Sequence, residues 1–313
     1  MKRIISLALV VALLLCLFSG CGSTPETLKV MSFNIQTEQG ADLPFSQRTV
    51  MFTDILKQYQ PDSIGMQEVT PRWLTRLGEV FGENYAGVSA PTETSDNDAC
   101  SIFYRTDKFD LVDQGVLWLS DTPDVAGSKF PESNYVRICT WARLKNKNTG
   151  NEYVHFNTHL DHNGHNTGDE AMQLRTAQGK VILEFAQSLG DIPLVFTGDL
   201  NQGHTDDNDE PRELYKYLTG LAGYVSESGI EVKGAFADAR LEAPDTVSPE
   251  EWASMGKYHT EGERYDPARK PLDFIFYTAA DFDALVYRNI NYRVDDYWYM
   301  SDHLPQYCEL TFK

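Results

Sequence analysis

The sequence lacks the basic stripe with which proteins usually hold a long nucleic acid. Its 313 residues include 27 Lys and Arg against 46 Asp and Glu, a formal net charge of −19. Proteins that bind DNA or RNA neutralise the phosphates with clustered basic side chains. The composition therefore argues against a nucleic-acid-binding protein, although net charge does not describe distribution and leaves a local positive cleft open.

Cysteine is scarce, and none is spaced as a metal ligand. The chain has five cysteines and no C-x-x-C pair. Cys16 and Cys21 lie in an N-terminal segment that is described below, so three remain, and three cannot all pair with one another. Cys139 and Cys308 lie in apolar runs. We therefore expect buried free thiols rather than disulfides or a zinc site.

Linkers, internal repeats and low-complexity tracts are also missing after Leu28. Their absence predicts a single domain over residues 28–313. One stretch differs in character, because residues 226–270 are acidic, contain proline and show little periodicity. A connection of this length without elements of its own is often functional.

The first residues have the pattern of an export signal. Lys2 and Arg3 form a positive start, and an apolar run from Ile4 to Phe18 follows them. This run is too short to span a bilayer comfortably but long enough for the hydrophobic part of a signal peptide. We predict a signal peptide of the lipoprotein type over residues 1–20.

The end of this segment resembles a bacterial lipobox. It reads Leu17-Phe18-Ser19-Gly20-Cys21, with Phe in the position where Leu is preferred. We predict lipidation of Cys21, a tether over residues 21–27 and an exported lipoprotein anchored in the bacterial cell envelope. An ordinary signal peptide cleaved nearby, or an uncleaved anchor, is the alternative. Cleavage leaves 25 basic against 46 acidic residues, a net charge of −21.

Hydrophobic periodicity predicts many strands between helices. Helical spacing indicates helices over residues 46–58, 71–80, 169–189 and 213–221. Apolar runs indicate strands over residues 28–35, 63–69, 85–89, 101–104, 111–119, 136–144, 153–160, 193–197, 272–277, 284–289 and 306–312. This order suggests stacked sheets with helices outside, in the α/β (α+β) class.

Polar side chains of catalytic type recur at the ends of these apolar runs. They are Asn34, Glu68, His159, Asp199, Asn201, Asp273, Asp302 and His303. Each one alone has an ordinary interpretation as a cap or turn residue. Strand ends at one edge of a sheet converge in space, however, so the joint pattern predicts one pocket built from separate segments.

Six short motifs around these residues carry a family resemblance. In chain order they are Ser32-Phe33-Asn34, Gln67-Glu68, Asn157-Thr158-His159-Leu160, Gly198-Asp199-Leu200-Asn201, Leu272-Asp273-Phe274-Ile275 and Ser301-Asp302-His303-Leu304-Pro305. They resemble, in the same order, the motifs of the endonuclease/exonuclease/phosphatase superfamily with the DNase I-like fold. The resemblance implies a four-layer α/β sandwich, in which helices flank two packed mixed sheets, and a divalent-metal-dependent phosphoesterase. Another metallophosphatase class needs a later Gly-Asn-His-Asp/Glu motif, which is absent here.

The resemblance and the side-chain chemistry together suggest roles at the metal and the base. We expect Glu68 to be the main metal ligand, helped by Asn34 and Asp302, because hard oxygen donors suit Mg²⁺, with Mn²⁺ or Ca²⁺ as alternatives. We expect His303 to be the general base, since imidazole titrates near neutrality, and Asp273 to orient it.

The remaining motif residues are expected to position the reactants. Asp199 and Asn201 would place the water and the phosphate, and His159 would donate a hydrogen bond or a proton on the leaving-group side. The reaction would be in-line attack of water on a phosphate mono- or diester.

Other polar residues near the motifs are candidate substrate contacts. Arg137 suits a bidentate contact with phosphate oxygens. Asp161 and His162 follow the third motif in a polar loop, for which a solvated surface loop is the competing interpretation. His259 lies in the acidic 226–270 stretch and is the weakest candidate.

The motifs leave the substrate open. Members of this superfamily act on nucleic acids, inositol phosphates, sphingomyelin and other phosphorylated small molecules. The acidic charge and the predicted anchor favour a small phosphorylated molecule or a phospholipid headgroup as substrate, and disfavour duplex DNA. We expect the protein to be a monomer. An extracellular nuclease is the first alternative. A catalytically inactive, lipid-anchored binding protein is the second, and it would be expected to have lost Glu68, Asp199 or His303, which are all present.

Overall fold

The computed structural model describes residues 26–39, 41, 43–90, 99–162, 168–248, 271–294 and 299–313. One six-stranded sheet has the order β13 (Phe282–Asn289), β14 (Gln306–Phe312), β1 (Thr27–Asn34), β2 (Ser63–Gln67), β4 (Ser101–Arg105) and β3 (Tyr85–Val88). The other has the order β11 (Phe236–Asp238), β12 (Asp273–Thr278), β8 (Leu194–Asp199), β7 (Glu152–His159), β6 (Ile138–Asn146) and β5 (Phe109–Trp118).

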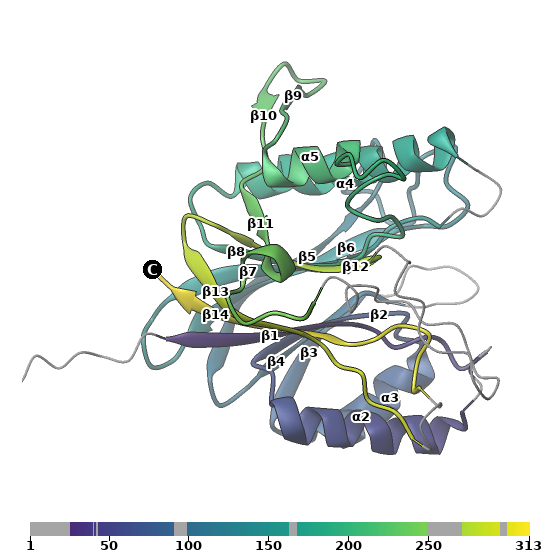
Figure 1. Ribbon diagram of the computed structural model, residues 1–313, viewed down its shortest axis with the longest axis vertical. Coiled ribbons are helices and arrows are strands. Elements are labelled where there is room, and N and C mark those ends of the chain that lie inside the picture. Colours follow the sequence, from purple (N-terminus) through teal and green to yellow (C-terminus); the bar gives the residue numbers. More distant parts are fainter. Residues whose placement is uncertain are drawn as a thin grey trace, which may run out of the picture.

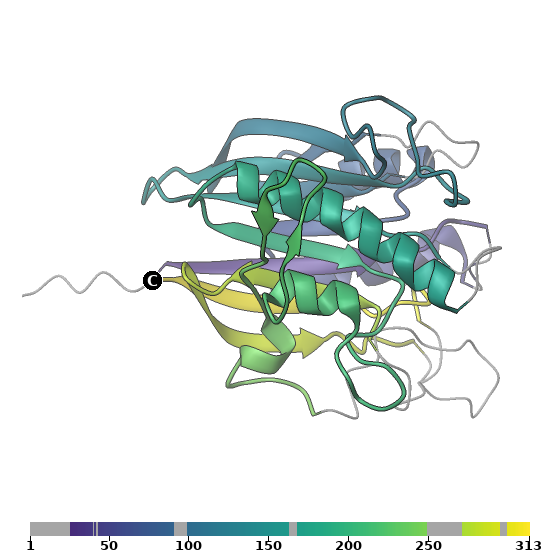
Figure 2. The same cartoon turned by 90° about the horizontal axis from the view of Figure 1, so that it is seen from above.

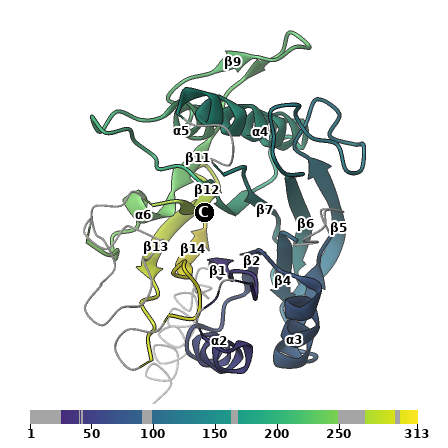
Figure 3. The ribbon, with the colours of Figure 1, turned by 90° about the vertical axis from the view of Figure 1, so that its right-hand side faces the viewer.

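The two sheets pack against each other between two layers of helices. Helices α2 (Phe45–Tyr59) and α3 (Pro71–Phe81) cover the first sheet, and α4 (Asp169–Ser188) and α5 (Glu213–Thr219) cover the second (Figure 1). Figure 3 shows the same four layers from the side. This architecture confirms the predicted four-layer α/β sandwich.

Local sequence explains where these helices begin and which face they bury. The side-chain oxygen of Thr70 accepts a hydrogen bond from the backbone nitrogen of Trp73 at 3.2 Å, and Pro71 occupies the first turn, so α3 begins with two standard start signals. Trp73, Leu77 and Phe81 then bury one face of α3 at helical spacing. These side chains join the apolar cluster under the first sheet.

Two parallel strand pairs determine where the site can form. Strand β1 pairs with β2 in parallel, and β7 pairs with β8 in parallel. The connections pass through α2 and α4, and α4 lies over the second sheet when seen from above (Figure 2). Ligands of α/β sheets bind at the carboxyl ends of such strands. Most of the predicted site residues lie at those ends.

The interior between the sheets becomes polar toward this edge. The Asn157 side chain of β7 donates to the carbonyls of Met66 and Ser101 at 2.9 and 3.0 Å, and so binds the second sheet to the first. Its amide oxygen accepts from Thr197 Oγ1 at 3.1 Å. Gly65 permits this close approach, because a Cβ atom there would lie 1.9 Å from Thr197 Oγ1.

A buried histidine in this layer makes stability depend on pH. His155 is fully buried, its Nε2 lies 2.9 Å from Thr197 Oγ1, and burial lowers the pKa of the imidazole to about 3. The unfolded chain titrates near the ordinary value of about 6.5. Between those two values the unfolded state binds a proton that the native state does not, so acidification favours unfolding.

We therefore expect His155 to lower the free energy of unfolding by about 1.4 kcal/mol per pH unit as the pH falls below about 6. Urea denaturation of the wild type and of His155→Gln, both in chelator, at pH 7, 6, 5 and 4 measures this. The variant should show the shallower acid slope. Equal slopes in the two proteins would contradict the assignment.

The 226–270 stretch is not without structure, contrary to the prediction. Its described part contains β10 (Glu231–Val232), which pairs with β9 (Tyr224–Val225), then the edge strand β11 and the short helix α6 (Ala239–Glu242). Elements of two to four residues are too short to produce a periodic pattern. Residues 249–270, including His259, lie outside the described residues.

Two further expectations concern cysteines and the membrane. Cys139 and Cys308 are buried free thiols, as predicted, and Cys100 is buried as well. Within the described ranges, no helix has the length and apolarity needed to cross a membrane. The segment containing Cys21 lies outside those ranges.

Candidate active site

The site residues come together because strands from both sheets end at the same place. Asn34 ends β1, His159 ends β7 and Asp199 ends β8. Strand β12 runs antiparallel to β8, and its first residue, Asp273, is paired directly with Asp199. Asn34 Nδ2 donates to Asp199 Oδ2 at 3.1 Å and so links the ends of the two sheets.

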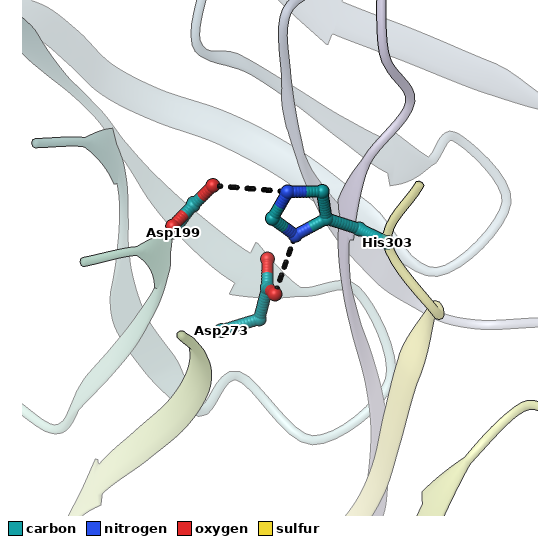
Figure 4. Close-up of side chains that lie close together, drawn as sticks. All are labelled: Asp199, Asp273 and His303. Carbon is teal, nitrogen blue, oxygen red and sulfur yellow. Dashed lines mark hydrogen bonds and ion pairs between the residues drawn. The ribbon is translucent and has the colours of Figure 1, made fainter. Parts of the chain in front are cut away.

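His303 lies between two carboxylates (Figure 4). Its Nδ1 is 2.7 Å from Asp273 Oδ2, and its Nε2 is 3.6 Å from Asp199 Oδ2. Burial alone would lower the pKa of His303, but the negative charges of Asp273, Asp199 and Asp302 raise it well above the usual value. The ring therefore sits in a strongly anionic environment that stabilises its protonated form.

The loop that carries His303 is attached to β1. Ser301 Oγ donates to the Asn34 carbonyl at 2.7 Å and accepts from the His303 backbone nitrogen at 3.1 Å. Position 303 is consequently held relative to Asn34 by two hydrogen bonds through one hydroxyl group.

Asp199 is the central acceptor of the site. Its Oδ1 accepts from the Asn201 backbone nitrogen at 2.9 Å, and its Oδ2 lies 3.5 Å from His159 Nε2. Burial and the charge of Asp273 raise the pKa of Asp199 to about 6. Asn201 adopts a left-handed backbone with φ of 50°, which Asn tolerates, and its side chain donates to the Leu160 carbonyl at 2.9 Å.

His159 has the opposite electrostatic character from His303. Burial lowers the pKa of His159 well below its usual value, and the positive charge of Arg137, together with His303 and His162, lowers it further. The ring is therefore neutral at neutral pH, and a neutral imidazole offers one donor and one acceptor nitrogen. The site thus contains one histidine whose surroundings favour the protonated form, His303, and one whose surroundings favour the neutral form, His159.

Glu68, Asn34 and Asp302 form a group of oxygen donors next to this histidine pair. Glu68 Oε1 accepts from Asn34 Nδ2 at 3.0 Å, and Glu68 Oε2 accepts from the Thr37 backbone nitrogen at 2.9 Å. Burial and the charge of Asp302 raise the pKa of Glu68, and burial followed by the charge of Asp199 raises that of Asp302. Two half-buried, mutually repelling carboxylates and an amide fit a hard divalent cation, which would relieve the repulsion.

A second group also has the composition of a metal site. Among the residues that the structure describes, ligand atoms of Asp199, Asp273 and His303 all lie within 4.8 Å of one another. The Nδ1 of His303 is already at hydrogen-bond distance from Asp273. This arrangement also fits an acid–base pair with a carboxylate orienting the imidazole.

The weaker predicted contacts have different surroundings. Arg137 is buried, its Nε has no hydrogen-bond partner within the described residues, and its guanidinium lies 5.3 Å from the Tyr135 ring. His162 packs edge-on against the same ring at 4.8 Å. The Asp161 carboxylate accepts hydrogen bonds from the Ser133 hydroxyl and the Asn134 backbone nitrogen, so it braces that turn.

One buried residue close to the site, Arg48, was not predicted from the sequence. Arg48 on α2 is buried beneath the loop that joins β1 to α2 and donates to backbone carbonyls there. The signal in the sequence is an arginine on the buried face that α2 otherwise forms with Met51, Phe52 and Ile55. A charged residue in an apolar helical stripe indicates a polar partner that periodicity does not reveal.

Fold and site together define a hydrolase that acts on phosphoric esters. The chain belongs to the endonuclease/exonuclease/phosphatase family, which it matches over residues 31–303. It is 28% identical over 299 residues to nocturnin of Drosophila melanogaster, an alignment that covers 85% of this chain and 42% of that protein. The chain therefore spans less than half the length of that relative.

Solved structures agree with this membership. An endonuclease/exonuclease/phosphatase family protein of Bacteroides thetaiotaomicron has a TM-score of 0.74 and 26% identity, covering 93% of this chain and 99% of that one. The mannosyl-6-phosphatase of the same organism has a TM-score of 0.72 and 26% identity, covering 91% of this chain and 100% of that one.

Proposed function

We propose that the chain hydrolyses a phosphate mono- or diester of a small phosphorylated molecule or a phospholipid headgroup, using water activated by His303 and Asp273. The observation that carries this proposal is the position of the His303 ring, with Nδ1 2.7 Å from Asp273 Oδ2 and Nε2 directed at Asp199. Nε2 is thus the nitrogen available for proton transfer.

Each residue then has a defined task. The carboxylates around His303 favour its protonated form, so it acts as the base only in molecules whose Nε2 is deprotonated. In those molecules Asp273 holds the proton on Nδ1 and stabilises the imidazolium that forms when Nε2 takes a proton from water. Asp199 and Asn201 orient the water and the phosphate at the end of β8. His159, neutral at working pH, donates a hydrogen bond toward the leaving oxygen.

Glu68, with Asn34 and Asp302, would hold the divalent cation that the family resemblance implies, and Mg²⁺ suits these oxygen donors. A bound cation of this kind withdraws charge from the phosphoryl oxygens during attack. The chain's own contribution is to hold Glu68 in one orientation through the Thr37 and Asn34 hydrogen bonds.

Arg137 supplies positive charge next to His159 in a strongly acidic chain. Its charge reaches His159, and its guanidinium is buried beside Tyr135. A phosphate bound at His159 would neutralise this buried cation. We include Arg137, and more weakly His162, in the substrate site. Asp161 has the weaker case for direct contact, since Ser133 and Asn134 occupy one of its oxygens.

Two observations favour a small substrate. The net charge of the whole chain is −19, which opposes binding of a polyanion such as DNA. In addition, one of the similar solved structures is a mannosyl-6-phosphatase. A sugar phosphate is therefore the first substrate to test.

A substrate panel tests this function. The mature domain would be assayed with a sugar phosphate, a bis-aryl phosphodiester, inositol phosphates, sphingomyelin, nucleotides and plasmid DNA, each with Mg²⁺, with Mn²⁺ and with chelator. We expect metal-dependent turnover of a small ester and none of plasmid. Plasmid cleavage that falls steeply with salt would identify the nuclease alternative instead. A folded protein with no turnover would support the inactive binding protein.

We also propose that Cys21 carries a lipid and anchors the protein in the bacterial envelope. The support is the order of a basic start, an apolar run and Ser19-Gly20-Cys21. In cells expressing the full chain, Cys21→Ala should move the protein from the membrane to the soluble fraction. Retention of the variant in the membrane would contradict the anchor.

A further inference from the structure

We propose that Arg48 is a positioning residue that ties together two loops: the loop after β1, which orients Glu68 and Asn34, and the 299–303 loop, which carries Asp302 and His303. The proposal rests on the proposed function for the roles of Glu68, Asp302 and His303. Its geometry stands on the hydrogen bonds of Arg48 alone.

The Arg48 guanidinium donates hydrogen bonds to four backbone carbonyls in two loops. Nη2 donates to the carbonyl of Ile35 and, at 2.8 Å, to that of Gln36; Nη1 donates to that of Thr37 at 3.1 Å. Nε donates to the carbonyl of Met300. Three consecutive carbonyls after β1 and one in the 299–303 loop are thus held by one planar group.

Each loop that Arg48 holds also positions a site residue directly. The Thr37 backbone nitrogen donates to Glu68 Oε2 at 2.9 Å, and the Gln36 backbone nitrogen donates to Asn34 Oδ1 at 3.0 Å. Met300 lies two residues before Asp302. A movement of Arg48 would therefore move the backbone that holds Glu68 and Asn34, and also the backbone that carries Asp302 and His303.

The first loop needs this support because of its backbone. Gln36 has a φ of 59°, in the left-handed region that side chains other than Gly and Asn seldom adopt. Its carbonyl is held by Arg48 and by Trp73 Nε1, which donates at 3.0 Å. The Trp73 ring also lies 4.9 Å from the Arg48 guanidinium carbon. Lysine has no planar fork, so it cannot reach the same acceptors together.

The chain contains a matched control for this arginine. Arg240 is as buried as Arg48, at 1% exposure each, and its guanidinium carbon also lies 4.9 Å from an aromatic ring, that of Phe274. Its ion pair within the described residues is with Asp238 on the edge strand β11. Arg240→Lys therefore removes a buried guanidinium whose described ion pair lies outside the two site loops.

The test compares Arg48→Lys with Arg240→Lys in the mature chain. We expect Arg48→Lys to lower kcat about 10- to 100-fold with KM within about twofold of wild type, and to weaken Mn²⁺ binding, measured by calorimetry without substrate, by about tenfold, as outer-shell changes at metal sites do. Arg240→Lys should lower Tm and leave kcat and Mn²⁺ affinity within about twofold. Added guanidinium should restore part of the kcat of Arg48→Ala.

A readout that needs no turnover separates this inference from the proposed function. The proton between His303 Nδ1 and Asp273 gives a low-field NMR signal, which should shift or broaden in folded Arg48→Lys and not in Arg240→Lys. If the His303 signal differs between the two lysine variants but the wild type turns over no substrate, only the proposed function is contradicted. Equal effects of the two lysine variants on Mn²⁺ affinity and on the His303 signal would overturn the positioning role, whatever the turnover.

Discussion

Replacing His303 with alanine is expected to lower kcat by about 10²- to 10⁴-fold, the range that a positioned general base contributes. The structure gives the reason. The Nδ1 atom of His303 lies 2.7 Å from the buried carboxylate of Asp273, and its Nε2 atom lies 3.6 Å from Asp199 Oδ2. Without the ring, water at this position has no acceptor of suitable basicity. Steady-state kinetics on the best substrate of the panel measures the loss.

The control is the Tm of the variant, which shows whether it remains folded. The His303 side chain is a small part of the buried volume, and the Ser301 hydroxyl still joins the loop of residue 303 to the Asn34 carbonyl. We therefore expect Tm within a few degrees of wild type. The companion variant Asp273→Asn should lower kcat as well, because the amide can donate to Nδ1 and favour the wrong tautomer. If His303→Ala retained kcat within about threefold, another residue would be the base.

Replacing Glu68 with glutamine is expected to weaken divalent-cation binding and to lower kcat/KM by about 10³-fold at a fixed, low Mg²⁺ concentration. Loss of several kcal/mol of charge stabilisation corresponds to a factor of this size. Glutamine keeps an oxygen that can accept from the Thr37 backbone nitrogen, so the change removes charge more than shape. Excess metal should recover part of the rate, and chelator should abolish turnover by the wild type.

Glu38→Gln is the matched control for this experiment. Glu38 is another half-buried carboxylate and directly follows Thr37 in the loop after β1. It accepts a hydrogen bond from Thr70 Oγ1 at 2.7 Å, and it is not a proposed metal ligand. We expect its metal affinity to stay within about threefold of wild type. If Asp199→Asn weakened metal binding and Glu68→Gln did not, the cation would belong to the group of Asp199, Asp273 and His303.

The two histidines explain how one pocket can serve both sides of the reaction. His303 is surrounded by carboxylates that favour its charged form, whereas His159 is buried near Arg137, which disfavours charge. These environments keep the two imidazoles in different protonation states at neutral pH, with His303 charged and His159 neutral. His303 can therefore serve as the base only after it has lost the proton on Nε2. In this chain the separation comes largely from tertiary neighbours, since Asp273 and Asp199 act on His303 and Arg137 acts on His159 from other segments of the chain.

The sequence by itself determined the longer helices and strands and the set of motif residues proposed for the site. The predicted strand over 306–312 coincides with β14. The predicted helix over 46–58 is one residue shorter than α2 at each end, and the predicted helix over 71–80 is one residue shorter than α3 at its C-terminal end. These segments are long and bury one face, so their periodicity is clear. Six motifs in order also identified the family, which the match over residues 31–303 confirms.

Only the tertiary structure decided how those residues meet. The motifs predicted that Asp273 orients His303, but nothing in the sequence indicates that Asp273 is paired across the sheet with Asp199, or that the second nitrogen of His303 lies near Asp199. Periodicity records which face of an element is buried but not which element covers it. The acceptors of Arg48 and the opposite pKa shifts of the two histidines depend on through-space distances between segments up to 252 residues apart. Those distances exist only after both sheets have packed.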